Sequence, residues 1–187
     1  MRVFLAFDIS ERVKEKALQA IKKLKRAGGN VRWVKPENMH FTIKFFGEIA
    51  QADLDNINDV IIKNIHKFSP FKIRVEGINT FPPLPKNPRV VWAGIENYRE
   101  LENIHNTLIE DFRKIGFPEE HREFKPHLTL GRVKNTNGIS GLKKAIENNE
   151  QMSFGECEVN ELVLYKSKLT PSGPIYTEIY KYSLETQ

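Results

Sequence analysis

Two four-residue stretches, His40-Phe41-Thr42-Ile43 and His127-Leu128-Thr129-Leu130, share one pattern of histidine, apolar residue, threonine and apolar residue. Successive side chains of a β-strand point to opposite faces of the sheet. Each stretch therefore predicts a strand with an imidazole and a hydroxyl on one face and two apolar side chains buried behind it. If the fold brings the two polar faces together, two imidazoles and two hydroxyls surround one cleft. Such a cleft suits a phosphate group.

Length and composition fit a single folded unit. The chain has 187 residues, of which 40% are hydrophobic and 28% charged, so it can bury a sizeable core. We expect one domain over residues 1–187, built as two lobes. The formal net charge of +5 permits an anionic partner such as nucleic acid, although many small basic proteins bind none.

Cysteine usage and hydropathy indicate a cytoplasmic protein. Cys157 is the sole cysteine, which excludes an intrachain disulfide and a cysteine-based zinc site. Its neighbours Glu156 and Glu158 are expected to raise the pKa of the thiol, which disfavours a catalytic thiolate. We expect no signal peptide and no membrane span, because the first apolar run is short and no stretch approaches ~20 apolar residues.

The spacing of apolar residues predicts alternating strands and helices. The predicted strands span 2–9, 31–34, 40–46, 71–80, 90–95, 127–133, 154–164 and 175–184. The predicted helices span 13–27, 54–68, 101–116 and 142–149, and Ser10 is the expected N-cap of the first. The order repeats loosely in the two halves, which favours an α+β fold of two pseudo-symmetric lobes. Each lobe is expected to hold a mostly antiparallel sheet with helices outside, around a central cleft.

The residue types in the two motifs suit acid–base chemistry at phosphorus. Histidine titrates near neutral pH, so one imidazole can act as a general base and the other as a general acid. The Thr42 and Thr129 hydroxyls can hold the non-bridging phosphate oxygens. Strict alternation would turn Arg132 away from the cleft, but a bend at Gly131 would bring its guanidinium back to neutralise phosphate charge.

Other kinds of site have weaker support. The motifs offer only two imidazoles and no carboxylate at fixed spacing, which is too few ligands for a zinc site. The chain contains no G-x-S-x-G nucleophile elbow and no G-x-x-x-x-G-K-[ST] phosphate loop. His66 and His105 lie in predicted helices and His121 in a charged loop, so we expect these three to be surface residues.

Aromatic and cationic residues near the motifs are candidates for contact with RNA. Aromatic side chains can stack on bases, although in strands they are more often part of the core; the candidates are Trp33, Phe46, Phe81 and Trp92. The cations that could guide an RNA backbone are Arg32, Lys35, Lys44, Arg89, Lys125 and Lys134, for which solvated surface charge is the alternative. The segment Tyr165-Lys166-Ser167 is expected to point into the same cleft.

The motifs resemble those of the two-histidine phosphoesterase superfamily, and most closely those of the RNA 2′,3′-cyclic phosphodiesterases, first named 2′-5′ RNA ligases. The resemblance covers nearly the whole chain, including residues 2–7, 32–34, 40–47, 126–132 and 162–167. It implies a bilobal α+β fold around a groove. It also implies that His40 and His127 act as acid and base, that Thr42 and Thr129 bind phosphate, and that Arg132 belongs to the active site.

The resemblance implies hydrolysis of a terminal RNA 2′,3′-cyclic phosphate to a 2′-phosphate, without metal or cofactor. We assign His127 as base and His40 as acid, and the reverse 2′-5′ ligation would use the same groups in swapped roles. The implied partners are RNA ends, tRNA fragments among them, and we expect a monomer. Two alternatives stay open: a module that binds RNA ends without cleaving them, and a phosphodiesterase for a small cyclic nucleotide or ADP-ribose cyclic phosphate.

Overall fold

The computed structural model describes residues 1–118 and 123–185, so the predicted position of His121 lies outside the described residues. The described part contains four α-helices, one 3-10 turn and nine strands. The strands are β1 (Arg2–Asp8), β2 (Asn30–Trp33), β3 (His40–Glu48), β4 (Phe71–Phe81), β5 (Val90–Glu96), β6 (His127–Asn135), β7 (Ser153–Val159), β8 (Glu161–Thr170) and β9 (Gly173–Ser183). The helices are α1 (Glu11–Arg26), η1 (Pro36–Asn38), α2 (Gln51–Ile65), α3 (Arg99–Lys114) and α4 (Ile139–Glu147).

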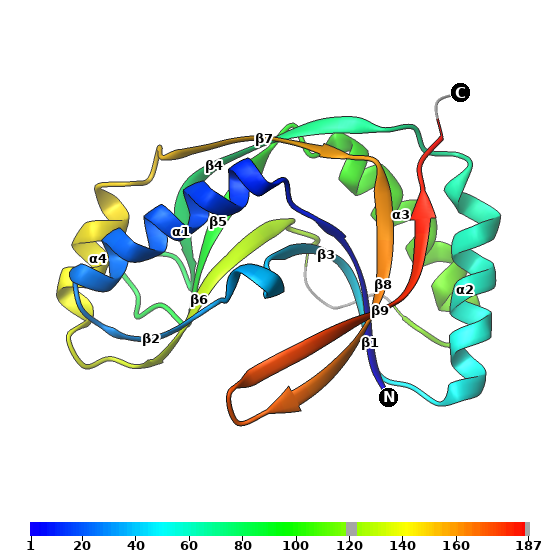
Figure 1. Cartoon of the computed structure of the whole chain (residues 1–187), viewed down its shortest axis with the longest axis horizontal. Coiled ribbons are helices and arrows are strands. Elements are labelled where there is room, and N and C mark those ends of the chain that lie inside the picture. Colours follow the sequence, from blue (N-terminus) through cyan, green and yellow to red (C-terminus); the bar gives the residue numbers. More distant parts are fainter. Residues whose placement is uncertain (119–122, 186–187) are drawn as a thin grey trace.

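The strands form one curled antiparallel sheet with two similar halves. Its order is β7-β4-β5-β6-β3-β1-β8-β9, and β2 pairs with β6 beside this path. From its centre outward, one half reads β3-β1-β8-β9 and the other β6-β5-β4-β7, so a motif strand stands first in each. The β8–β9 hairpin projects from the body of the molecule (Figure 1). The predicted α+β class with two pseudo-symmetric lobes is confirmed.

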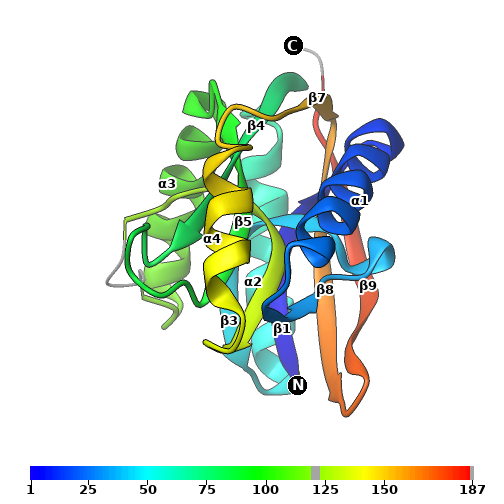
Figure 2. The ribbon, with the colours of Figure 1, turned by 90° about the vertical axis from the view of Figure 1, so that its left-hand side faces the viewer.

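The helices cover the outside of the lobes, and two of them, α1 and α3, pack on the lobe opposite the strand that precedes them in the chain. Helix α1 follows β1 in the chain but packs on β7 and beside α4, in the other lobe. Helix α3 follows β5 but packs against α2 and β3. The pair α1 and α4 lies at the left of Figure 1 and the pair α2 and α3 at the right; in Figure 2, viewed from that left-hand side, α1 and α4 are nearer the viewer than α2 and α3. Each lobe is therefore completed by a helix whose preceding strand belongs to its neighbour.

Local sequence accounts for the boundaries of α1. The Ser10 hydroxyl accepts a hydrogen bond from the Val13 N–H, as predicted for an N-cap. One stripe of the helix is buried, formed by Val13, Ala17, Ala20, Ile21 and Leu24. Basic residues occupy the last turn, where they complement the helix dipole. Gly28 and Gly29 follow with φ of 96° and 84°, a conformation that ends the helix.

The predicted strand 154–164 is wrong, because the structure divides it into two strands at Asn160. β7 pairs with β4 in one lobe, whereas β8 pairs with β1 in the other. The chain thus passes from one lobe to the other at Asn160, whose carbonyl accepts a hydrogen bond from the Leu184 N–H. A continuous run of strand-forming residues cannot reveal a change of partner strand. The fourth helix also begins earlier than predicted, at Ile139.

Candidate active site

The two motif strands meet at the centre of the sheet. β3 and β6 pair antiparallel through Phe41 and Leu128, the second residue of each motif. In antiparallel order this register sets His40 beside Thr129 and Thr42 beside His127, all on the opposite face from the buried apolar pair. Phe41 and Leu128 are both fully buried. The sheet therefore joins the two polar faces that the sequence placed far apart.

A cavity of about 580 Å³ opens over this junction. All five predicted site residues line it: His40, Thr42, His127, Thr129 and Arg132. The remaining walls come from β1, the segment from β2 to η1, β3 and the β8–β9 hairpin, which contribute Arg2, Phe4, Arg32, Trp33, Val34, Lys35, Asn38, Phe45, Ser167, Leu169, Ser172, Gly173, Pro174 and Tyr176. The hairpin thus forms one wall and the β2 region another.

Both motif strands have a β-bulge at the fourth residue of the motif. The pairing register skips Ile43 on β3 and Leu130 on β6, each the fourth residue of its motif. An extra residue reverses the alternation of the side chains beyond it. Arg132 consequently faces the cleft, as predicted from a bend near Gly131. Phe45 faces the cleft by the same geometry, since it also lies five positions after its motif histidine.

Gly131 has a second role in shaping the cleft. A Cβ atom at this position would lie 2.7 Å from Val31 Cγ1 and 2.8 Å from Trp33 Cε3. β2 therefore lies closer to β6 than any larger residue at 131 would allow. This close approach positions Arg32 and Trp33 in the wall of the cleft.

His127 is held by a backbone hydrogen bond that determines its tautomer. Its Nδ1 lies 2.7 Å from the Lys125 carbonyl oxygen, and because a carbonyl can only accept, Nδ1 carries the hydrogen. The neutral ring then keeps its lone pair on Nε2. Burial lowers the pKa of His127, the Lys125 carbonyl opposes this, and the charges of Arg132 and Lys125 lower it further. The rings of Phe81 and Trp92 pack against it at 5.2 Å and 5.7 Å between centroids.

His40 has a related setting with a different charge beside it. Burial lowers the pKa of His40 to about 4, and a hydrogen bond with the Asn38 backbone and the nearby Asp8 carboxylate both oppose this shift. The rings of Phe4 and Tyr176 lie 4.8 Å and 5.1 Å from the imidazole. Both motif histidines are therefore neutral at pH 7 when the cleft is empty.

The cleft is positively charged. Its cations are Arg2, Arg32, Lys35 and Arg132, and none of the described lining residues is an aspartate or glutamate. Of the other predicted cations, Lys44 is buried and donates a hydrogen bond to the Pro118 carbonyl at 2.7 Å. Lys125 lies 5.3 Å from the centre of the Trp92 ring, behind His127. The described residues contain no cluster of three or more histidine, cysteine, aspartate or glutamate side chains that could hold a metal ion.

The aromatic candidates divide between the cleft and the core, the two alternatives left open by the sequence. Trp33 lines the cleft, but Phe46 is buried in the core, where it packs edge-on against Phe112. Its neighbour Phe45 faces the cleft instead, with 47% of its surface exposed. Strict alternation from His40 would put Phe46 on the open face, and the bulge at Ile43 puts Phe45 there instead. The equal spacing from the motif histidines to Phe45 and Arg132 is the signal that identifies it.

Several other predicted positions can now be located. Ser167 lines the cleft as expected, whereas Tyr165 is buried and donates a hydrogen bond to Asp8 at 2.7 Å. Burial raises the pKa of the Cys157 thiol, which does not line the cleft. His105 is not a surface residue, because it is buried in α3 and stacks on Phe124 at 4.0 Å. No helix in the described ranges is long and apolar enough to cross a membrane.

Comparison with known proteins identifies the family. The model of the 2'-5' RNA ligase superfamily matches residues 11–170. This chain belongs to that superfamily. Within it, the chain is 38% identical over 184 residues to the RNA 2',3'-cyclic phosphodiesterase of Methanothermobacter thermautotrophicus, covering 98% of this chain and 99% of the relative. It is 39% identical over 179 residues to the protein of the same name from Archaeoglobus fulgidus, covering 96% and 98%.

Solved structures of similar proteins share the fold. TT0787 of Thermus thermophilus matches with a TM-score of 0.84 and 28% identity, covering 98% of each chain. E. coli LigT complexed with 3'-AMP matches with a TM-score of 0.76 and 23% identity, covering 99% of this chain and 98% of LigT. The resemblance inferred from the motifs is therefore confirmed for the family and for the fold.

Proposed function

We propose that this chain hydrolyses the 2′,3′-cyclic phosphate at the end of an RNA to a 2′-phosphate, with His40 and His127 as its acid and base. The observation that carries the proposal is the junction of β3 and β6, where two histidine–threonine pairs meet in one cationic cleft. The relatives named RNA 2',3'-cyclic phosphodiesterase support the choice of substrate.

The reaction needs one proton removed and one supplied. His127 takes a proton from water through Nε2, and the water oxygen forms a bond to phosphorus. The bond from phosphorus to O3′ breaks, its electron pair stays on O3′, and His40 donates the proton that O3′ requires. The anionic phosphate raises the pKa of the imidazoles that face it, which lets His40 hold that proton at neutral pH.

The cleft also supplies contacts for the rest of an RNA end. Thr42, Thr129 and Arg132 line the cleft. In this proposal they hold the non-bridging oxygens, and Arg132 adds a charge-assisted contact. Phe45 and Trp33 offer faces on which bases can stack. The mechanism uses no metal ion. With the 5′-hydroxyl of a second RNA in place of water, 2′-5′ ligation would use His127 and His40 in the same roles and not in swapped ones, because O3′ is again the leaving oxygen; the excess of water favours hydrolysis.

We propose that the substrates include tRNA fragments and that the chain acts as a monomer in the cytoplasm. The cleft is complete within one chain, since a single copy supplies both histidines and all four lining cations. Size-exclusion chromatography with light scattering tests the monomer. Sequencing of cyclic-phosphate RNA ends in cells with and without the protein tests the fragments.

The deciding experiment incubates the protein with an oligoribonucleotide ending in a 2′,3′-cyclic phosphate, with EDTA present. We expect a 2′-phosphate product, identified by nuclease digestion and mass spectrometry. An intact cyclic end in the bound RNA would instead indicate a binding module. Faster turnover of 2′,3′-cyclic AMP than of the oligonucleotide would indicate a small-molecule phosphodiesterase. Loss of activity in EDTA, restored by a divalent cation, would contradict the metal-free mechanism.

A further inference from the structure

A carboxylate lies beside one of the two catalytic imidazoles. Asp8 is the last residue of β1 and pairs directly with His40 in the β1–β3 register. Directly opposed residues of antiparallel strands project to the same face, with Cβ atoms about 5 Å apart. The Asp8 side chain therefore stands next to His40 on the same face of the sheet, although it does not line the 580 Å³ cavity.

The Asp8 carboxylate is fixed by a tyrosine from the neighbouring strand. Tyr165 on β8 donates its hydroxyl hydrogen to Asp8 Oδ1 at 2.7 Å. Burial and the Asp8 charge raise the pKa of Tyr165 above its usual range, so the hydroxyl remains a donor. If the carboxylate turned away, the hydroxyl of this buried tyrosine would lose its partner. Phe4 packs against both His40 and Tyr165, with centroid distances of 4.8 Å and 5.3 Å, which ties the three side chains together.

The charges around the two histidines differ in sign. The titratable groups that face His40 are Asp8 on β1, His127 on β6, Tyr165 on β8 and Tyr176 on β9. Asp8 is the one that brings negative charge. His127 instead has the cations Arg132 and Lys125 beside it. A neighbouring carboxylate stabilises imidazolium, whereas neighbouring cations destabilise it.

We propose that Asp8, held by Tyr165, is a positioning residue that stabilises the imidazolium form of His40 and thereby makes His40, rather than His127, the proton donor to the leaving oxygen. This inference rests on the proposed hydrolysis. Asp8 touches no reacting atom and acts through His40. His40 gives its proton to O3′ as the phosphorus–oxygen bond breaks, and solvent returns a proton to the neutral ring.

The kinetic test uses D8N, which keeps the side-chain size and an acceptor for Tyr165 but removes the charge. We expect kcat at pH 7 to fall about 5–20-fold, with KM within about twofold, and the alkaline limb of the kcat–pH profile to move down by about one pH unit. Y165F leaves the charge but frees the carboxylate, so we expect a smaller loss of about 2–5-fold in kcat.

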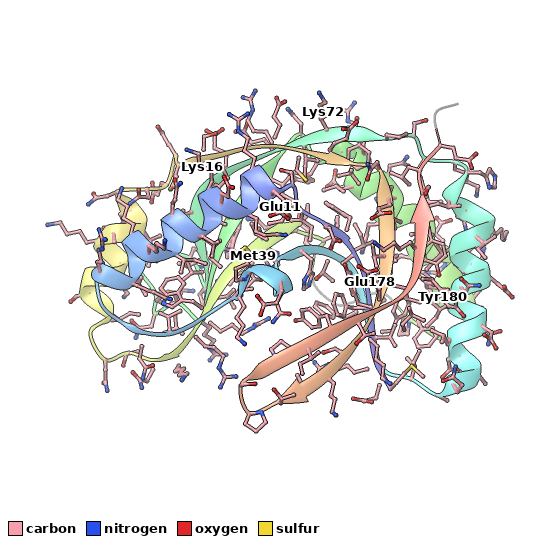
Figure 3. The ribbon with its side chains drawn as sticks, viewed as in Figure 1. Glu11, Lys16, Met39, Lys72, Glu178 and Tyr180 are labelled. Carbon is pink, nitrogen blue, oxygen red and sulfur yellow. The ribbon has the colours of Figure 1, made fainter. Side chains whose placement is uncertain are left out.

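The matched control is E178Q. Glu178 lies on β9 (Figure 3), opposite Tyr165 in the β8–β9 register, and forms an ion pair with Lys181 at 3.2 Å. The variant therefore removes one negative charge near Tyr165 but leaves the Asp8 carboxylate and its hydrogen bond in place. We expect its kcat and pH profile to stay within about twofold of the parent protein. An equal shift in E178Q and D8N would overturn the proposal, because the effect would then be one of net charge.

An NMR titration of the histidine rings in the empty protein gives a readout that needs no turnover. We expect D8N to lower the pKa of His40 and to leave that of His127 unchanged. An unchanged His40 titration, or an unchanged alkaline limb in a D8N protein with the parent melting temperature, would overturn the proposal. If the parent protein fails to hydrolyse cyclic-phosphate RNA, the proposed function fails, while the titration still decides whether Asp8 acts on His40.

Discussion

The two motif strands have the same local architecture but different neighbours. Each carries a histidine, a threonine and a bulge at the fourth motif residue, and each pairs with the other at the centre of the sheet. His40 lies beside Asp8, whereas His127 lies beside Lys125 and Arg132. Five positions after the histidine, one strand presents the ring of Phe45 and the other the guanidinium of Arg132.

This difference shows how a nearly symmetric scaffold produces directed chemistry. In the proposed mechanism, the symmetry of the two strands brings both imidazoles to one phosphate, as an in-line displacement requires. The unlike neighbours would then assign a different proton role to each imidazole. Phe45 and Arg132 would orient the substrate, with a base over the first lobe and phosphate charge over the second.

The largest expected effect comes from removing either imidazole. We expect H40A and H127A each to lower kcat on cyclic-phosphate RNA by about 10³-fold, with KM changed by less than about fivefold, because each removes one proton-transfer group. Initial rates across substrate concentrations give both constants. H66A serves as the control, since His66 ends α2 and does not line the cleft. A loss below tenfold in both histidine variants would contradict the two-histidine mechanism.

The next largest effects should distinguish the contribution of Arg132 to phosphate binding from that of Phe45 to base stacking. We expect R132A to lower kcat/KM by about 10²-fold on RNA and on 2′,3′-cyclic AMP alike, because it contacts phosphate. We expect F45A to raise KM by about 5–20-fold with a smaller change in kcat, because it loses base stacking. F45Y keeps the ring and is the matched control, expected to stay within about twofold. The same changes in kcat and KM in R132A and F45A would contradict the assignment of Arg132 to the phosphate and of Phe45 to a base.

A smaller effect concerns stability at low pH. Because burial depresses the pKa of His40 to about 4 in the folded protein, neutral His40 contributes stability above the unfolded value of about 6.5. This contribution is lost as the pH falls from 6.5 toward 4, and we expect it to amount to about 2 kcal/mol. Urea unfolding at pH 7 and pH 4.5 measures it, with H40Q as the control that lacks the titration. The same pH dependence in H40Q would assign the loss to other groups.

The last prediction concerns cooperativity: we expect the two lobes to unfold in a single step. We propose that residues 1–187 form one domain, because α1 and α3 each complete the lobe opposite their preceding strand. Calorimetry should then show one transition, with calorimetric and van't Hoff enthalpies equal within about 10%. Two resolved transitions would mean that the lobes unfold independently.

Strand periodicity in the sequence was sufficient to predict the central site. The histidine–threonine motifs needed only alternation and a pairing of β3 with β6, and the glycine at 131 indicated the bend that turns Arg132 inward. Phe45 was missed because the bulge in β3 has no glycine at the equivalent position, where Lys44 stands. The sequence of β6 therefore signals its bulge through Gly131, whereas the sequence of β3 has no such signal.

Features that depend on distant pairing could not be predicted. The role proposed for Asp8 rests on its register opposite His40 and on a tyrosine on β8, and neither contact can be read from the residues near Asp8 in the chain. The division of 154–164 into two strands depends on which strands they join, not on propensity. His105 was misplaced because its burial depends on stacking with Phe124, a residue outside its own helix.

The central claim is that the two imidazoles have opposite proton roles across one phosphate. The most direct test compares H40A and H127A on an RNA cyclic phosphate in which sulfur replaces O3′, because a thiolate leaves without being protonated. We predict that H40A regains most of its activity on this substrate, to within about tenfold of the parent protein, while H127A stays impaired by about 10³-fold. Rescue of H127A instead of H40A, or equal defects in both variants, would contradict the account.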